Sequence, residues 1–158
     1  MTDKEYREIG KSYLEPIKSV SIRINSLKED LNNTMNDIVS VGAIDYSKER
    51  LSGGGTPTGI ERCIIRLENK REAVQAEIRQ LIEERENAYD VIKHCTRGQE
   101  QILLLREYID GKDAKYAKSF IDRGKSQAND MKTAALIKVG AFINDGILLI
   151  GLNRQQSE

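Results

Sequence analysis

The sequence has no tryptophan, two cysteines, two prolines and one histidine, and aromatic residues make up only 5% of the chain. So few large aromatic side chains argue against a single large globular core. An excess charge of either sign is also absent, because 25 Lys and Arg residues balance 25 Asp and Glu residues. Attraction to nucleic acid would therefore need a local basic patch. Charged residues still make up 32% of the sequence, which indicates helices with solvated faces and a mostly α-helical protein.

Long apolar runs are missing as well. The sequence opens without the apolar segment of a signal peptide, and no window approaches the roughly 18 apolar residues that span a bilayer. We therefore expect a cytoplasmic protein with no membrane contact. Cys63 and Cys95 lie about 48 Å apart along one predicted helix. This separation excludes a disulfide between them while the helix is intact, so we expect reduced thiols.

Residues 60–95 contain no glycine or proline, and their apolar residues recur three and four positions apart. This spacing places them on one face of a long α-helix, in a heptad seam that needs a partner helix. Arg71 and Arg85 interrupt the seam, and we expect them to reach its edge or to pair with acidic residues of the facing helix. We also expect the seam to support self-association, with a dimer favoured. The residues predicted to make this contact are Ile60, Ile64, Leu67, Val74, Ile78, Leu81 and Ile92.

A second seam over residues 17–38 is the natural partner of this helix. It follows Pro16, which is expected to end or kink a short first helix over residues 3–14. Residues 40–59 contain three consecutive glycines and Pro57, and predict a flexible loop. The loop allows the two helices to pack antiparallel within one chain or to exchange between chains. Its glycines lack the Gly-Lys-Ser/Thr ending of a phosphate-binding loop.

Beyond Gly98 the pattern changes to shorter amphipathic segments, which predicts two domains. Residues 1–97 would form an antiparallel coiled-coil arm with the loop at 40–59, and residues 98–158 a helix-turn-helix module. In this module Gly111 would end a first helix, Asp113 would cap a second and Ser126 a third. The inward residues would be Ala114, Ala117, Phe120 and Ile121 in the second helix, and Ala128, Met131, Ala135, Leu136 and Val139 in the third.

The apolar segment at residues 140–153 has two interpretations, a short β-hairpin or a helical extension. Either would have to be buried, because an exposed segment of this kind promotes aggregation.

The order of these parts, and above all the stretch Leu104-Leu105-Arg106-Glu107-Tyr108-Ile109-Asp110-Gly111-Lys112, resembles the phage-encoded late transcriptional regulators of the ArpU/RinA type. In that family, as in sigma-factor region 4, such a segment leads into the DNA-binding helices. Tyr116-Ala117 is similar to the family's Ile-Ala in the first of them. Lys125-Ser126-Gln127-Ala128 is similar to the Arg-Ser-Thr-Val that opens the recognition helix, and Ala135-Leu136 to its closing Ala-Leu. The resemblance implies regulation of transcription, with double-stranded DNA and host RNA polymerase as partners.

Charge supports a DNA-binding hypothesis. From Lys112 to Lys138, seven Lys and Arg residues accompany three Asp residues in a chain whose net charge is zero. Polar residues at the start of a recognition helix reach base edges, which makes Ser126, Gln127 and Asn129 the base-reading candidates. Lys125 and Lys132 would read bases or clamp phosphate, and Lys112, Lys115 and Arg123 would hold phosphates.

Other interpretations remain open. The basic stretch could be an ordinary solvated helical surface, and the chain a coiled-coil adaptor, virion component or inhibitor without a DNA role. A DNA-packaging protein resembling a terminase small subunit also combines helix-turn-helix with coiled coil. We do not expect an enzyme, a cofactor, a small-molecule substrate or a metal, because no catalytic set is evident and His94 lacks companions at ligand spacing.

Overall fold

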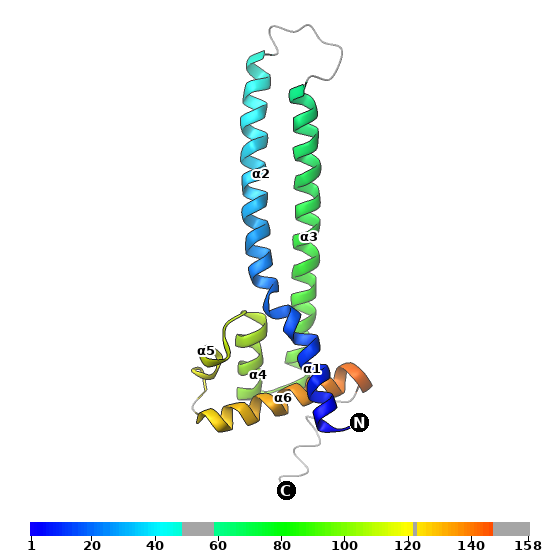
Figure 1. Ribbon diagram of the computed structural model, residues 1–158, viewed down its shortest axis with the longest axis vertical. Coiled ribbons are helices and arrows are strands. Elements are labelled where there is room, and N and C mark those ends of the chain that lie inside the picture. Colours follow the sequence, from blue (N-terminus) through cyan, green and yellow to red (C-terminus); the bar gives the residue numbers. More distant parts are fainter. Residues whose placement is uncertain (49–58, 122, 147–158) are drawn as a thin grey trace. The chain divides into compact units, whose positions relative to one another are not determined.

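The computed structural model describes residues 1–48, 59–121 and 123–146, and within these ranges it contains helices and no strand (Figure 1). The all-α prediction is confirmed. The elements are α1 (Asp3–Lys18), α2 (Val20–Lys48), α3 (Gly59–Cys95), α4 (Gly98–Leu104), the π-helix η1 (Leu105–Ile109), α5 (Ala114–Lys118) and α6 (Lys125–Asp145). No helix in the described ranges is both long enough and apolar enough to cross a membrane.

The chain divides into two compact units. The helix-pair unit is Arg23–Ile82, and the terminal unit combines Met1–Ile22 with Glu83–Glu158. This division differs from the boundary that the sequence suggested at residue 97. The difference arises because α1 packs across α6 and the end of α3 belongs with them, so that segments from both sides of residue 97 form one unit.

In the helix-pair unit, α2 and α3 run antiparallel and side by side (Figure 1). Arg23 of α2 pairs with Glu77 of α3 at 3.4 Å. The apolar seam is covered within the chain, since Ile24, Val74 and Ile78 are buried. Thr34 is also buried, and its hydroxyl donates to the Asp30 carbonyl at 2.8 Å, which satisfies a polar group within the seam.

Two predicted helix ends were wrong. Helix α2 continues to Lys48, so residues 40–48 of the predicted loop are helical; one interior glycine, Gly42, costs only about 1 kcal/mol. Helix α1 continues past Pro16 to Lys18 and breaks at Ser19, whose hydroxyl donates to the Pro16 carbonyl at 3.1 Å. The rest of the loop, with its glycine run, lies outside the described residues.

The terminal unit is organised by the crossing of α1 and α6. Thr2 and Glu5 form a capping box that starts α1. Gly10 of α1 and Gly140 of α6 meet where the helices cross, and a Cβ on either would overlap the other helix's backbone. The two backbones can approach this closely only because both residues lack a side chain. The buried side chains of the unit include Leu14, Ala88, Ile92, Cys95, Leu103, Leu104, Tyr108, Ala135, Leu136 and Val139.

Helix α4 passes directly into η1, where Glu107 and Tyr108 are both buried. The predicted stop at Gly111 is confirmed in position, since Gly111 has a left-handed φ of 70°. A Cβ at Gly111 would lie 2.8 Å from the Lys18 carbonyl oxygen, so two separate constraints favour glycine here.

Asp113 caps α5 as predicted, and its carboxylate accepts from the Tyr116 backbone N–H at 2.7 Å. Phe120, expected to face inward, is 49% exposed, whereas Ile121, which also follows the end of α5 at Lys118, is buried as predicted. The predicted cap at Ser126 is also wrong: Gly124 takes the N-cap position and Ser126 lies inside the first turn. The inward residues predicted for α6 are buried, except Met131, which is half-buried.

Residues 140–145 form the last turns of α6, which ends at Gly146 with a left-handed φ of 68°. The helical interpretation therefore holds for this part of the apolar segment. A hairpin turning at residues 144–146 is excluded, because Asn144 and Asp145 are helical. The remainder of the segment, residues 147–153, lies outside the described residues.

Candidate nucleic-acid interface

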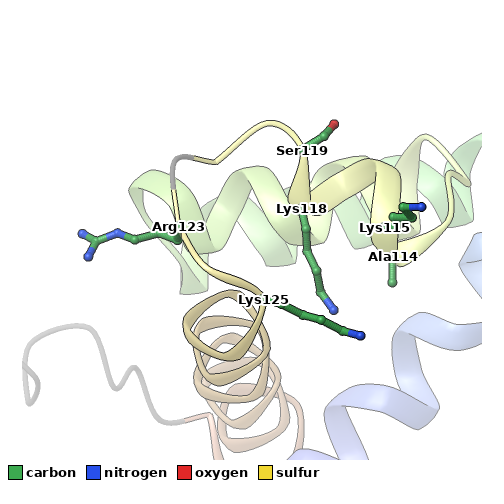
Figure 2. A pocket seen from close by; sticks show the side chains of 6 residues that line it. All are labelled: Ala114, Lys115, Lys118, Ser119, Arg123 and Lys125. Carbon is green, nitrogen blue, oxygen red and sulfur yellow. The ribbon is translucent and has the colours of Figure 1, made fainter.

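A pocket of about 630 Å³ lies between α5 and the start of α6 (Figure 2). The residues that line it in the described part of the chain are Ala114, Lys115, Lys118, Ser119, Arg123 and Lys125. Four of these six are cationic and none is acidic. In a chain without net charge, this gathering makes a locally positive surface.

The cationic side chains around the pocket do not all point the same way. Lys118 and Lys125 extend their ammonium groups toward the same side, whereas Arg123 points away from them (Figure 2). The Lys118 ammonium donates to the side-chain oxygen of Asn129, and the Arg123 Nε donates to the Gln99 side chain at 3.4 Å. Lys118 was not among the predicted site residues, although its spacing of three from Lys115 on one helix could have suggested it.

The start of α6 adds to the positive potential. Gly124 at the N-cap has no side chain that could accept from the N–H groups of the first turn. These groups and the helix dipole favour an anion beside Lys125, the first residue of this 21-residue helix.

A small apolar cluster holds these elements together. Leu103, Ala117, Ile121 and Ala128 are buried in it, with Ile102 and Met131 packed against it. The two alanines have little volume, which allows close packing at this point. The arrangement sets the pocket beside the first turn of α6.

The predicted base-reading residues share this region. Ser126 and Gln127 are exposed in the first turn of α6, and Asn129 is exposed while accepting from Lys118. Lys112 does not line the pocket, and its ammonium lies 5.6 Å from the centre of the Tyr116 ring.

Lys132 is engaged elsewhere. Its ammonium lies 2.7 and 2.8 Å from the two carboxylate oxygens of Glu107, a residue only 2% exposed. Sequence reasoning missed Glu107. No local sequence pattern distinguishes this glutamate from a solvated one, and only the structure shows that it is buried, four residues after the buried Leu103.

The residues predicted to mediate self-association lie along α3. Val74, Ile78, Leu81 and Ile92 are buried within the single chain, and Ile60, Ile64 and Leu67 are half-buried. Arg71 pairs with Glu68 of its own helix at 2.6 Å, and Arg85 donates to the Ser21 hydroxyl at 3.1 Å. Met35, Val39 and Ile65 are large apolar residues of the helix-pair unit that remain exposed.

The remaining side chains considered in the sequence are His94 and the cysteines. His94 packs edge-on against Phe142, with ring centres 5.2 Å apart. Among the residues that the structure describes, no group of three His, Cys, Asp or Glu side chains could hold a metal ion. Burial raises the pKa of the Cys95 thiol to about 11, which keeps it protonated near neutrality.

Comparisons of the chain with protein-family models, curated proteins and solved structures found no match.

Proposed function

We propose that this protein is a sequence-specific regulator of transcription that binds double-stranded DNA, with α5 and α6 as a helix-turn-helix. The observation on which the proposal depends is the cationic pocket beside the first turn of α6, which has no acidic residue among its described lining. A duplex presents closely spaced phosphates, and a helix start flanked by lysines suits one of them. The resemblance to phage late regulators supports the same function.

The surface suggests a division of roles. Lys115, Lys118, Arg123 and Lys125 line the pocket and are proposed to hold phosphates, as is Lys112, which does not line it. Ser126 and Gln127 project from the first turn of α6, where a recognition helix contacts base edges. Asn129 accepts from Lys118, and would therefore connect the phosphate-holding residues with the base-reading ones.

Helix-turn-helix proteins commonly bind DNA as dimers. We propose that this chain dimerises through the exposed apolar residues of its α2–α3 coiled-coil arm, namely Met35, Val39 and Ile65, which are 46%, 72% and 57% exposed. The heptad seam is a poorer candidate, because its central residues are already covered within the chain.

Salt-dependent DNA binding tests the proposal. The probes are a duplex selected from random sequence by the wild-type protein and an unselected duplex of the same length. Gln127→Ala should cost about 1–3 kcal/mol on the selected duplex and much less on the other, because only the specific complex loses a base contact. Lys115→Ala should weaken binding to both alike and lower the slope of log affinity against log salt by about 0.9.

Lys70→Ala is the matched control, since Lys70 is an exposed lysine of α3 far along the sequence from the pocket. It should change neither the affinities nor the slope. A wild-type Kd above about 100 μM on both duplexes at moderate salt, weaker than ordinary non-specific binding, would refute the proposal.

An interaction protein without a DNA role is the second candidate, and one observation favours it. Tyr116 and Phe120 are 46% and 49% exposed, and their rings meet edge-on at 5.1 Å. The Arg106 guanidinium lies 5.6 Å from the Phe120 ring. Exposed aromatic residues beside arginine are typical of protein-binding surfaces. Should DNA binding fail, this function takes its place.

If the selected duplex matches a packaging site rather than a promoter, a packaging protein is indicated instead.

A further inference from the structure

A buried carboxylate in the terminal unit is shared by two lysines. The Glu107 side chain is 3% exposed, and its Oε1 lies 3.1 Å from the Lys18 Nζ and 2.8 Å from the Lys132 Nζ. The Lys132 Nζ also lies 2.7 Å from the other carboxylate oxygen. The three residues come from three elements: Lys18 from α1, Glu107 from η1 and Lys132 from α6.

Burial makes this carboxylate a strong partner. A charged group removed from water requires opposite charge and hydrogen bonds, and Glu107 obtains both from the two ammonium groups. The Tyr108 ring lies beside both, with its centre 5.4 Å from the Lys18 Nζ and 5.8 Å from the Lys132 Nζ. Both cations are therefore directed toward the interior of the unit, although their side chains remain 31% and 23% exposed.

Lys132 nevertheless lies on the same side of α6 as Lys125, which lines the cationic pocket. Lys125, Asn129 and Lys132 are spaced four and three apart, so they follow one another along the same side of the helix. Lys125 lines the pocket, and Asn129 accepts from Lys118. If the Lys132 ammonium were released from Glu107, it would extend the cationic surface by one charge along α6.

We propose that Glu107 withholds Lys132 from DNA and so limits the number of phosphates that α6 neutralises. This inference rests on the proposed DNA-binding function. Non-specific affinity depends on how many phosphates the protein contacts, and each contact contributes about 0.9 to the salt slope. Withholding one lysine lowers binding to random sequence and leaves the base contacts of α6 intact. Glu107 is thus a positioning residue that acts through Lys132.

Two single variants and their combination test this on the full chain, with a random duplex titrated at several salt concentrations. Lys132→Ala should leave the salt slope unchanged, because the wild-type Lys132 does not contact phosphate. Glu107→Gln removes the carboxylate charge while keeping its shape, and should steepen the slope by about 0.9 and strengthen binding to random DNA. The double variant should return the slope to the wild-type value, because the gain depends on Lys132.

Circular dichroism establishes whether each variant is folded. A Lys132→Ala slope lower by about 0.9 would show that Lys132 contacts phosphate already, and would overturn the inference. An unchanged slope in a folded Glu107→Gln variant would overturn it too. If Glu107→Gln does not fold, Glu107→Asp takes its place, because a carboxylate shorter by one methylene should loosen the contact with Lys132 and steepen the slope in the same direction. An unchanged slope in that folded variant would overturn the inference. A wild-type protein that binds no duplex would refute the proposed function and this inference together.

Discussion

Gly140 of α6 lies directly against the backbone of Tyr6 in α1, so close that a Cβ on Gly140 would overlap the Tyr6 carbonyl oxygen. Gly10 meets the Leu136 carbonyl in the same way from the other side of the crossing. Because both obstacles are backbone atoms rather than flexible side chains, the helices would have to separate to admit even a methyl group.

Gly140→Ala should therefore lower the free energy of unfolding by about 1–3 kcal/mol or more, because the added methyl group forces α1 away from α6. Gly42→Ala is the matched control, since Gly42 is also helical and has open space at its Cβ. It should raise stability by about 0.4–1 kcal/mol. Urea unfolding followed by circular dichroism measures both changes. Equal effects of the two substitutions would contradict the close crossing.

In the helix pair, buried apolar residues should stabilise the fold, whereas exposed ones should matter only for contact with a second copy. Leu81→Ala should cost about 2–5 kcal/mol, because Leu81 is 4% exposed and its removal leaves a cavity. Ile65→Ala should change stability by no more than about 0.5 kcal/mol, because Ile65 is exposed. Thermal or urea unfolding distinguishes the two.

The exposed apolar residues of the helix pair also allow a test of the proposed dimer. In light scattering, Val39→Asp combined with Ile65→Asp should reduce the mass of a wild-type dimer to that of one chain, because the charges oppose burial of the apolar contact. A wild-type mass equal to one chain would contradict the proposed dimer.

Cys95 and Cys63 should differ sharply in reactivity, because Cys95 is buried and Cys63 is exposed. Iodoacetamide at pH 8 should modify Cys63 alone in the folded protein and both cysteines in denaturant, as counted by mass spectrometry. The Cys63→Ser variant should then gain no adduct while folded. Rapid modification of Cys95 in that variant would show that the terminal unit opens readily.

The raised pKa of Cys95 also predicts a pH dependence. The folded-state pKa of about 11 lies above the ordinary value of 9, so burial of the neutral thiol stabilises the protein fully below pH 9. That contribution is lost as the pH rises from 9 to 11. Over this window the wild type should lose more stability than Cys95→Ala in parallel urea titrations.

Local patterns in the sequence predicted local structure well. The three-and-four spacing in residues 60–95 predicted a long helix, and α3 spans Gly59–Cys95. Asp113 and Gly111 marked helix ends because capping depends on a few neighbouring residues. Helical spacing failed at Phe120, because this residue lies beyond the end of α5 at Lys118, where that spacing no longer decides which side chains face inward.

Contacts between distant segments were not predictable in this way. Gly10 and Gly140 lie near opposite ends of the described chain, and neither has a local pattern that indicates the other. Because α1 packs on α6, Met1–Ile22 belongs to the same unit as Glu83–Glu158, whereas the sequence suggested a single boundary at residue 97. For the candidate site, the basic stretch indicated the region, but the pairing of Lys132 with Glu107 depends on the fold of the whole terminal unit.

The terminal unit joins segments that are far apart in the sequence, and this affects how it can form during synthesis on the ribosome. Helix α1 is made well before α6, the helix that it packs against. At about 5–20 residues per second, the ribosome needs roughly 7–27 s to advance from Tyr6 to Gly140. The contiguous α2–α3 pair can form during this interval, whereas α1 must wait with its apolar face uncovered. A nascent chain that stalls before α6 would present this face to chaperones and proteases.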